Sequence, residues 1–449
     1  MDKIEQRICE LIDQHREDII AFGQDIWHHA EMGYKEFRTA AKFQEAIEGR
    51  CARVETGLAI TGVKGYLKEK KEGELIVSVM GELDALPIPT HPDANPQTGA
   101  SHCCGHNAQL TGVMGALIAL ADEEVMASLD GNVVFFGVPA EEFVDIEFKN
   151  SLMKEGKIAY GGGKCELIRI GALEDIDITV GHHTDPAAGV RIGNGHNNGF
   201  VNKTVRYLGK ASHAAGSPEK GIDALAAAEL AMHAINLQRE SFRDEDSVRV
   251  HGFISRGGTA MNVIADTVTM EYSVRANNIP AFMEASEKFD RAIRAGAIAS
   301  GCGAEIVTLP GYLPTVPAND TSAMKEAMTT LQESYPQVEF DFSDGEDSTG
   351  STDFGDLSNL MPLLQFKTGG YRGVLHNASM QAVDEELAYV VTAKMFALTV
   401  YHLLKNNAEK ARSLIAGFDP KFTRDSYRQY MDSVSKTETL DMQPMPSQK

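Results

Sequence analysis

The chain of 449 residues lacks the segments that mark membrane and secreted proteins. It contains no run of about 18 apolar residues, which a membrane-spanning helix requires, so no membrane span is expected. Residues 4–26 carry apolar side chains at helical spacing with acidic residues between them, which indicates an amphipathic helix and not a signal peptide. The six cysteines form no Cys-x-x-Cys pair and no disulfide framework, so we expect reduced thiols in a cytoplasmic protein.

Basic residues are scarce. There are 42 lysines and arginines against 64 aspartates and glutamates, which gives a formal net charge of −22. Such a surface repels nucleic-acid phosphates and anionic membranes, so neither is an expected partner. A small anionic substrate is still compatible with this charge, because a local basic pocket can override the global field.

Several catalytic motifs are also missing. None of the 14 histidines precedes a glutamate, which excludes the His-Glu-x-x-His zinc helix. The three Gly-Lys pairs are followed by Ile158, Cys165 and Ala211, so there is no phosphate-binding loop. No Gly-x-Ser-x-Gly nucleophile elbow occurs, and the glycines at 161–163 lack the spacing of a dinucleotide-binding turn.

Three short apolar segments, 75–80, 132–138 and 176–180, are each followed by a polar cluster. Their β-branched residues and flanking breakers predict buried strands. Helical stretches lie between them, notably 108–128, and this alternation predicts an α/β domain with a mostly parallel central sheet. Ligands of such sheets bind beyond the carboxyl ends of the strands, where all three polar clusters are expected.

The middle of the chain has a different pattern. The predicted order is a strand at 200–208, a helix at 221–239, strands at 248–254 and 267–275, a helix at 279–300 and a strand at 304–309. This β-α-β-β-α-β order is typical of the split ferredoxin-like unit. We therefore expect an inserted α+β domain at 195–310, within a first domain formed by 1–194 and 311–449. The first domain should end in a helix at 384–405, and the polar tail after Gly417 is expected to be frayed.

The polar clusters contain candidate metal ligands. Cys104 and His106 stand two residues apart before a helix, so both can face one ion, and thiolate with imidazole suits zinc and similar divalent metals. Taken alone, such a pair is more often structural. The Glu141-Glu142 pair can divide two tasks, one carboxylate binding metal and the other accepting a proton from metal-activated water. An isolated pair is more often a solvated strand end.

Three further positions are ambiguous by themselves. His182 and His183 are adjacent and point to opposite sides of an extended chain, so at most one should bind metal. His376 lies in a glycine-flanked loop, where a histidine is usually solvated. Asp84 can orient a metal-binding histidine by accepting its second N–H, or it can serve as a turn aspartate before Pro87.

Read together and in order, these motifs resemble one family. They are GELDALP at 81–87, CGHN at 104–107, GVPAEE at 137–142, GHHTDP at 181–186, GKASHAAGSP at 209–218 and a late histidine. The order resembles the aminoacylase/carboxypeptidase class of metallopeptidases, in the amidohydrolase branch with hippurate hydrolase, auxin-conjugate amidohydrolases and p-aminobenzoyl-glutamate hydrolase. The resemblance spans about residues 4–404. STDFGD at 351–356 looks most like the p-aminobenzoyl-glutamate hydrolase and β-alanyl dipeptidase side of that branch.

The resemblance implies a metallopeptidase catalytic domain and an inserted lid domain that forms a homodimer. It implies two divalent ions per subunit, zinc or manganese with cobalt as a further option, held by Cys104, His106, Glu142, His183 and His376. Glu141 would be the general base and Asp84 would support the site. His213 would reach the partner subunit's site, while Asn262 and Arg275 would hold a substrate carboxylate. Without the resemblance, His213 is a loop histidine and Arg275 a solvated strand end.

The expected reaction is hydrolysis of the amide bond of an N-acyl amino acid or a p-aminobenzoyl-glutamate-like conjugate with a free carboxylate. A β-alanyl-type dipeptidase is the alternative, followed by a catalytically inactive relative that binds a metabolite. The chain departs from many relatives at Asn107, where they have aspartate, and at His376-Asn377-Ala378, where they have His-Ser-Pro or His-Thr-Pro. Neither departure removes a ligand.

Overall fold

The computed structural model describes residues 1–187 and 189–442 and divides into two compact units. The first unit contains Met1–His196, Val316–Asp347 and Thr352–Arg424. The second contains Asn197–Thr315, Ser348–Ser351 and the segment that starts at Asp425. The second unit is thus an insertion to which the C-terminal segment is added.

The first unit is built on an eight-stranded sheet. In spatial order its strands are β1 (Arg53–Leu58), β2 (Gly62–Tyr66), β6 (Asn132–Val138), β3 (Ile76–Glu82), β7 (Ile178–Thr184), β14 (Leu363–Thr368), β8 (Val190–Ile192) and β13 (Phe340–Asp341). The four central strands from β6 to β14 are parallel to one another. The predicted α/β domain with a mostly parallel sheet is confirmed.

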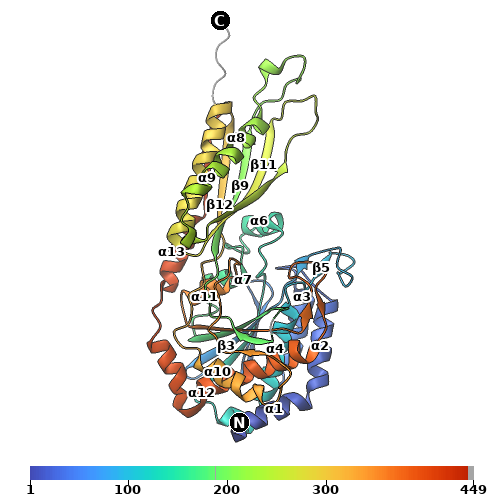
Figure 1. Ribbon diagram of the computed structural model, residues 1–449, viewed down its shortest axis with the longest axis vertical. Helices are drawn as coiled ribbons and strands as arrows, with labels where there is room; N and C mark the ends of the chain where they lie inside the picture. Colours follow the sequence, from blue (N-terminus) through green and yellow to red (C-terminus); the bar gives the residue numbers. More distant parts are fainter. Residues whose placement is uncertain (188, 443–449) are drawn as a thin grey trace. The chain divides into compact units, whose positions relative to one another are not determined.

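Helices surround this sheet (Figure 1). The helices of the first unit are α1 (Lys3–Gln14), α2 (Arg16–His28), α3 (Phe37–Ile47), α4 (His106–Leu120), α5 (Glu123–Ala127), α6 (Ile146–Lys154), α7 (Gly163–Arg169), α10 (Ser322–Gln332), α11 (Phe354–Ser358) and α12 (Thr392–Ala416). The strand pairs β4 (Leu86–Pro87) with β5 (Ala100–Ser101) and β15 (Tyr371–Arg372) with β16 (Gln381–Ala382) form small separate sheets.

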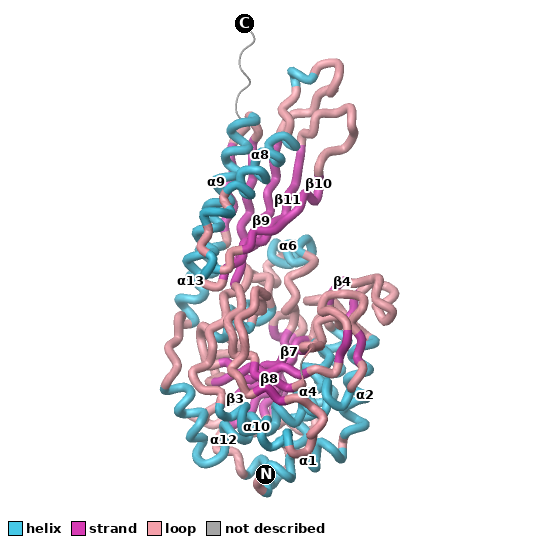
Figure 2. Tube along the Cα trace, in the orientation of Figure 1, coloured by secondary structure: helices cyan, strands magenta, loops and turns pink. Residues whose placement is uncertain are grey.

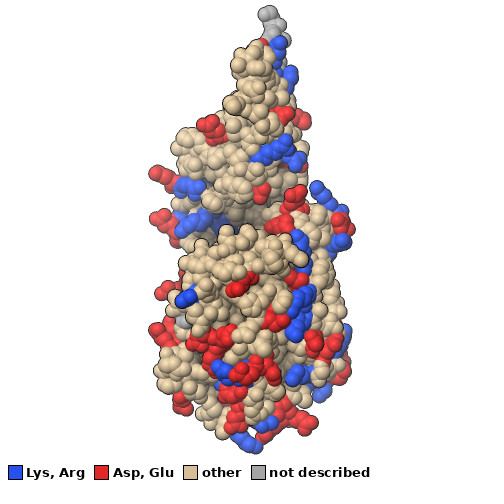
Figure 3. Space-filling model, turned by 90° about the vertical axis from the view of Figure 1, so that its right-hand side faces the viewer, with Lys and Arg blue, Asp and Glu red and all other residues tan. Residues whose placement is uncertain are grey.

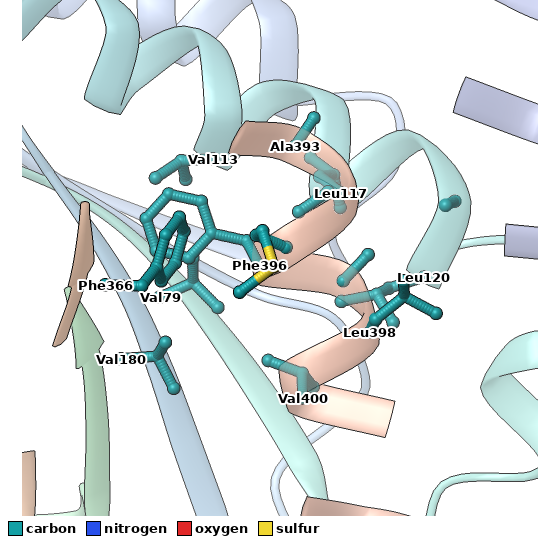
Figure 4. Packing of buried hydrophobic residues seen from close by; sticks show 14 of the residues in the cluster. Val79, Val113, Leu117, Leu120, Val180, Phe366, Ala393, Phe396, Leu398 and Val400 are labelled. Carbon is teal, nitrogen blue, oxygen red and sulfur yellow. The ribbon is translucent and has the colours of Figure 1, made fainter. Parts of the chain in front are cut away.

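Helix α4 is buried along its whole length. Figure 4 shows its Val113 and Leu117 together with Phe396 of α12, above Val180 and Phe366 of the sheet. A helix that is apolar all round must be a core helix. The predicted helix at 108–128 is nevertheless two helices, because the Asp122 side chain accepts the backbone N–H groups of Glu124 and Val125 and caps α5.

One helical stretch, Glu386–Ala416, is long and apolar enough to cross a membrane, and 94% of its most apolar window is buried inside the protein. Its burial identifies it as a core helix. Its first residues, Glu386–Val391, are π-helical, and the backbone leaves helical geometry at 405–408 before it resumes. The end of the helix predicted at 405 therefore coincides with a break in the helical backbone. Asp130 Oδ2 stabilises this break by accepting the Asn407 N–H at 2.6 Å.

The second unit contains a five-stranded antiparallel sheet beside two long helices (Figure 2). Its strands in spatial order are β10 (Arg249–Arg256), β11 (Thr267–Ala276), β9 (Gly199–Leu208), β12 (Gly303–Pro310) and β17 (Lys436–Leu440), and its helices are α8 (Ala224–Leu237) and α9 (Ile279–Ser300). Along the chain, β9-α8-β10-β11-α9-β12 has the predicted β-α-β-β-α-β order. The four strands of this motif lie in the arrangement of a split β-α-β unit.

The C-terminal segment differs from the expectation of a frayed tail in the first domain. The chain leaves the first unit after Arg424, and α13 (Arg424–Val434) leads into β17, which pairs antiparallel with β12 of the second unit. Val434 joins the apolar core of the second unit, and Arg294 binds Glu438 at 2.6 Å. The added strand covers a sheet edge that would otherwise present unpaired backbone groups. Residues 443–449, at the end of the expected tail, lie outside the described residues.

Candidate active site

The polar clusters meet at one edge of the central sheet. Strands β3, β6 and β7 are neighbours and parallel, so their carboxyl ends lie side by side. The loop before α4 approaches this edge closely at Gly105, whose φ is 86°. A Cβ at that position would lie 2.1 Å from Thr184 Oγ1, so only glycine fits between Cys104 and His106.

The structure brings the five predicted metal ligands together in the first unit. Cys104 Sγ lies 3.5 Å from His183 Nε2, and Glu142 Oε1 lies 3.4 Å from His376 Nε2. One ligand atom from each of Cys104, His106 and Glu142 lies within 4.8 Å of the others. These three side chains are buried, whereas the His376 side chain is 53% exposed. The cluster therefore has one accessible side.

Asp84 orients the site. His106 Nδ1 lies 2.8 Å from the Asp84 carbonyl oxygen and 3.3 Å from its Oδ1, so we assign the ring proton to Nδ1. Nε2 faces Glu82 Oε2 at 3.0 Å and Glu141 Oε2 at 3.9 Å, and the Glu82 charge, which outweighs burial, raises the pKa of His106. Asp84 Oδ2 also accepts the backbone N–H of Glu142 at 2.8 Å. One aspartate thus sets the direction of a histidine and of a carboxylate, as expected for a residue that supports a metal ligand.

The donor atoms fit a divalent cation. His106 Nε2 and Glu142 Oε1 are buried and form no hydrogen bond. Burial raises the pKa of Glu142 to about 7, and burial with the charges of Glu82 and Glu142 raises the pKa of Glu141 well above its usual range. Burial also lowers the pKa of His183 to about 4, which keeps its ring neutral and able to bind metal. Buried carboxylate oxygens, a thiol and imidazole rings form a suitable donor set for zinc or a similar ion.

The loop that carries Glu141 and Glu142 is held by groups that the sequence did not indicate. Ala140 has a positive φ of 48°. Its N–H donates to the buried Glu36 carboxylate at 2.8 Å, and its carbonyl accepts the Gly163 N–H at 3.1 Å. Lys149 Nζ donates to the Glu142 carbonyl at 2.7 Å. No motif points to Glu36 or Lys149, because each acts through one contact that depends on the fold.

The two neighbouring histidines separate as expected from their alternation. His182 points away from Cys104, since its Nε2 lies 2.7 Å from Thr368 Oγ1 and its ring packs against Phe366 and Phe396. Asn107 is also directed away from the donor atoms. Its amide donates to the Tyr389 hydroxyl at 2.9 Å and accepts from the Tyr371 hydroxyl at 3.2 Å.

His213, Asn262 and Arg275 belong to the second unit. His213 is exposed, and its Nδ1 accepts the backbone N–H groups of Ala215 and Gly216, which leaves its ring proton on Nε2. The Ala214 N–H donates to the Asn262 carbonyl at 3.0 Å, so His213 and Asn262 are neighbours.

Arg275 lies near the other end of β11. It is eight residues beyond Thr267, about 27 Å at roughly 3.4 Å per residue. Its guanidinium stacks over the Phe200 ring at 5.1 Å and donates to Ser273 and Ser351, and it has no acidic partner within the described residues. One chain therefore does not bring Asn262 and Arg275 to the same carboxylate.

Comparison with known proteins identifies the family. Residues 79–402 match the model of peptidase family M20/M25/M40. The chain is 28% identical over 381 residues to an Xaa-Arg dipeptidase of Mus musculus, a match that covers 81% of this chain and 79% of the relative. It is 28% identical over 395 residues to an N-acetylcysteine deacetylase of Bacillus subtilis, covering 84% and 95%. One of the subunits of the p-aminobenzoyl-glutamate hydrolase of Escherichia coli is 27% identical over 308 residues, covering 65% and 57%.

Solved structures show the same fold. A dinuclear metal-binding peptidase of the M20 family from Bacillus subtilis superposes with a TM-score of 0.63 at 23% identity, covering 87% of this chain and 99% of the other. An aminobenzoyl-glutamate utilization protein from Klebsiella pneumoniae also gives 0.63, at 16% identity, covering 87% and 97%. The chain therefore belongs to peptidase family M20/M25/M40, and the expectation of a metal-dependent hydrolase of amide bonds is confirmed.

Proposed function

We propose that the protein hydrolyses the amide bond of an N-acyl amino acid or a p-aminobenzoyl-glutamate-like conjugate, with Glu141 as the general base. The observation that carries the proposal is the buried donor cluster of Cys104, His106 and Glu142 beside Glu141. Relatives named as a deacetylase and as part of a p-aminobenzoyl-glutamate hydrolase support the substrate class.

In the proposed reaction, two divalent ions would be held by Cys104, His106, Glu142, His183 and His376. Bound ions of this kind lower the pKa of water and polarise a carbonyl group. Zinc or manganese is the expected metal, because the donor set combines a thiol, imidazoles and a carboxylate. Asp84 keeps the His106 ring in the orientation that binds metal.

Glu141 would move the proton. Burial and the charges of Glu82 and Glu142 raise its pKa, and a more basic carboxylate is better able to accept a proton from water and then donate it to the leaving nitrogen. The buried surroundings of Glu141 keep bulk water from competing for that proton.

The substrate carboxylate would bind Arg275, whose planar guanidinium can form two parallel hydrogen bonds with it. The absence of an acidic partner among the described residues supports this assignment. His213 carries its proton on Nε2, so this N–H can donate a hydrogen bond to a developing oxyanion. Because Asn262 and Arg275 of one chain lie far apart, we propose that His213 and Asn262 act in the partner subunit's site of a homodimer.

A dipeptidase is the second candidate. The Xaa-Arg dipeptidases of mouse and human each match 81% of this chain at 28% and 29% identity. A dipeptide differs from an N-acyl amino acid by its free amine, so the two candidates predict opposite substrate preferences.

A substrate panel decides between them. The metal-loaded enzyme is assayed for kcat/KM with N-acetyl amino acids, p-aminobenzoyl-glutamate, β-alanyl dipeptides and Xaa-Arg dipeptides, each as the free acid and as the C-terminal amide. We expect the acyl compounds to exceed the dipeptides at least tenfold and the acids to exceed the amides. Faster dipeptides would select the second candidate, and no turnover by a protein that binds metal would indicate an inactive relative. Equal rates for acid and amide would contradict the role of Arg275.

Mixing two inactive variants tests the homodimer. Each site of a His213→Ala dimer or a Glu141→Gln dimer lacks one essential group, but one of the two sites in a mixed dimer is intact. We expect partial recovery of activity after the protomers exchange. If exchange is demonstrated and activity does not return, His213 does not act across the dimer.

A further inference from the structure

Three motif residues without an assigned role converge on one buried ion cluster. Glu82 comes from GELDALP, Lys164 follows the three glycines at 161–163, and Asp353 comes from STDFGD. Lys164 Nζ lies 2.5 Å from Glu82 Oε1 and also binds Asp353 Oδ1. All three side chains are at most 2% exposed. The cluster thus contains one ammonium and two carboxylates, away from water.

The segment around Lys164 is packed too tightly to adjust. The Lys164 backbone N–H donates to Asp353 Oδ2 at 2.9 Å. A Cβ at Gly163 would lie 1.7 Å from the Pro139 carbonyl oxygen, directly before the loop that carries Glu141. The glycines therefore let the chain pass close to the end of β6, and this close approach sets where the Lys164 ammonium lies.

The two carboxylates differ in what they face. Lys164 contacts both oxygens of Asp353, one through its Nζ and one through its backbone N–H. Glu82 gives one oxygen to Lys164, while its Oε2 accepts from Gln109 Nε2 at 2.7 Å and lies 3.0 Å from His106 Nε2. Ligand atoms of Glu82, His106 and Glu141 all lie within 4.8 Å of one another. Of the two carboxylates that bind Lys164, Glu82 is therefore the one that faces the candidate active site.

We propose that Glu82, held by Lys164 and Asp353, is a positioning residue of the metal centre, which orients the His106 ring and adds negative charge that strengthens cation binding. This inference rests on the proposed metal-dependent function. Its physical basis is geometric: Glu82 Oε2 lies 3.0 Å from His106 Nε2, so the carboxylate fixes the direction of the ring, and its negative charge attracts a cation bound beside that ring. Residues that contact metal ligands in this way typically change metal affinity about 10- to 100-fold when they are altered.

Matched variants test the proposal. Glu82→Gln and Asp353→Asn each remove one negative charge from a buried partner of Lys164, but only Glu82 faces His106. The readouts are the apparent zinc and manganese affinities, measured by competition with a chelator, and the melting temperature of the metal-free protein. We expect Glu82→Gln to weaken the affinity at least tenfold and Asp353→Asn to change it less than threefold, with similar losses of melting temperature.

Glu82→Asp keeps the charge and is expected to bind metal with an affinity between those of the wild type and Glu82→Gln. If Glu82→Gln does not fold, Glu82→Asp replaces it in the comparison. A metal affinity of Glu82→Asp equal to that of Asp353→Asn would then refute the proposal. Equal affinities of Glu82→Gln and Asp353→Asn would also refute it. A wild type that binds no metal would refute the proposed function. A wild type that binds metal, but no more tightly than Glu82→Gln, would refute only the role of Glu82.

Discussion

Each unit contains a completely buried lysine, which pairs with two carboxylates in the first unit and with one in the second, and the net charges of the two clusters differ in sign. In the first unit, Lys164 faces the two carboxylates of Glu82 and Asp353, and Glu82 also faces His106, a predicted metal ligand. In the second unit, Lys203 Nζ lies 2.7 Å from Asp290 Oδ1 and 2.8 Å from Thr308 Oγ1, and Lys436 lies 3.5 Å from the other Asp290 oxygen.

The difference separates a functional cluster from a structural one. The excess positive charge in the second unit belongs to Lys436, whose side chain is 45% exposed and is therefore stabilised by water. The second carboxylate in the first unit is buried and faces His106, so a cation bound at that ring would compensate its charge. Burial of a lysine is thus a poor guide to function, and the sign and direction of the remaining charge are more informative. On the face drawn in Figure 3, acidic and basic side chains are interspersed.

The largest expected effect is on turnover and concerns the first unit alone. Glu141→Gln removes proton transfer on both sides of the tetrahedral intermediate, so kcat should fall about 10²- to 10⁴-fold. Metal content, measured by elemental analysis, should stay the same, because Glu141 is assigned to the water and not to the ions. Near-normal turnover would show that the base lies elsewhere.

The next effect is on metal content. Cys104→Ala and His183→Ala should each reduce bound metal, because thiolate and imidazole are ligands of such sites. His182→Ala is the matched control, since its ring points toward Thr368 and Phe366 and its loss should lower stability without loss of metal. Elemental analysis of the purified variants distinguishes them. The same metal content in all three would contradict the ligand set.

The smallest effect on function is expected from Lys203→Met, which should lower the stability of the second unit and leave the metal site unchanged. Lys203→Met leaves the buried Asp290 with only the partly exposed Lys436, and breaking a buried pair in this way costs about 3–5 kcal/mol of unfolding free energy. Denaturant unfolding measures this loss, and metal affinity should not change. The double variant Lys203→Met, Asp290→Leu removes both charges and should recover most of the stability. A loss of metal from Lys203→Met would contradict the assignment of the Lys203 cluster to a purely structural role.

Local patterns predicted much of the fold. The strand at 132–138 and the helix at 279–300 agree with β6 and α9, because both have clear periodicity and clear breakers at their ends. Strand β17 was missed because it is a polar edge strand whose side chains are mostly exposed. Its partner β12 lies more than a hundred residues away, and a pairing at that separation leaves no local signal.

The sequence by itself determined the family, the alternation of strands and helices, and the residues that gather at the strand ends, because these depend on local periodicity and on motifs in a set order. Only the tertiary structure decided that Glu36 holds the Ala140 turn, that Asn107 bonds two tyrosines, and that Lys164 joins Glu82 and Asp353. These contacts join residues separated by 82 to 282 positions. Whether a buried charge has a counter-charge depends on the positions that the whole chain brings together, and a one-dimensional pattern does not contain those positions.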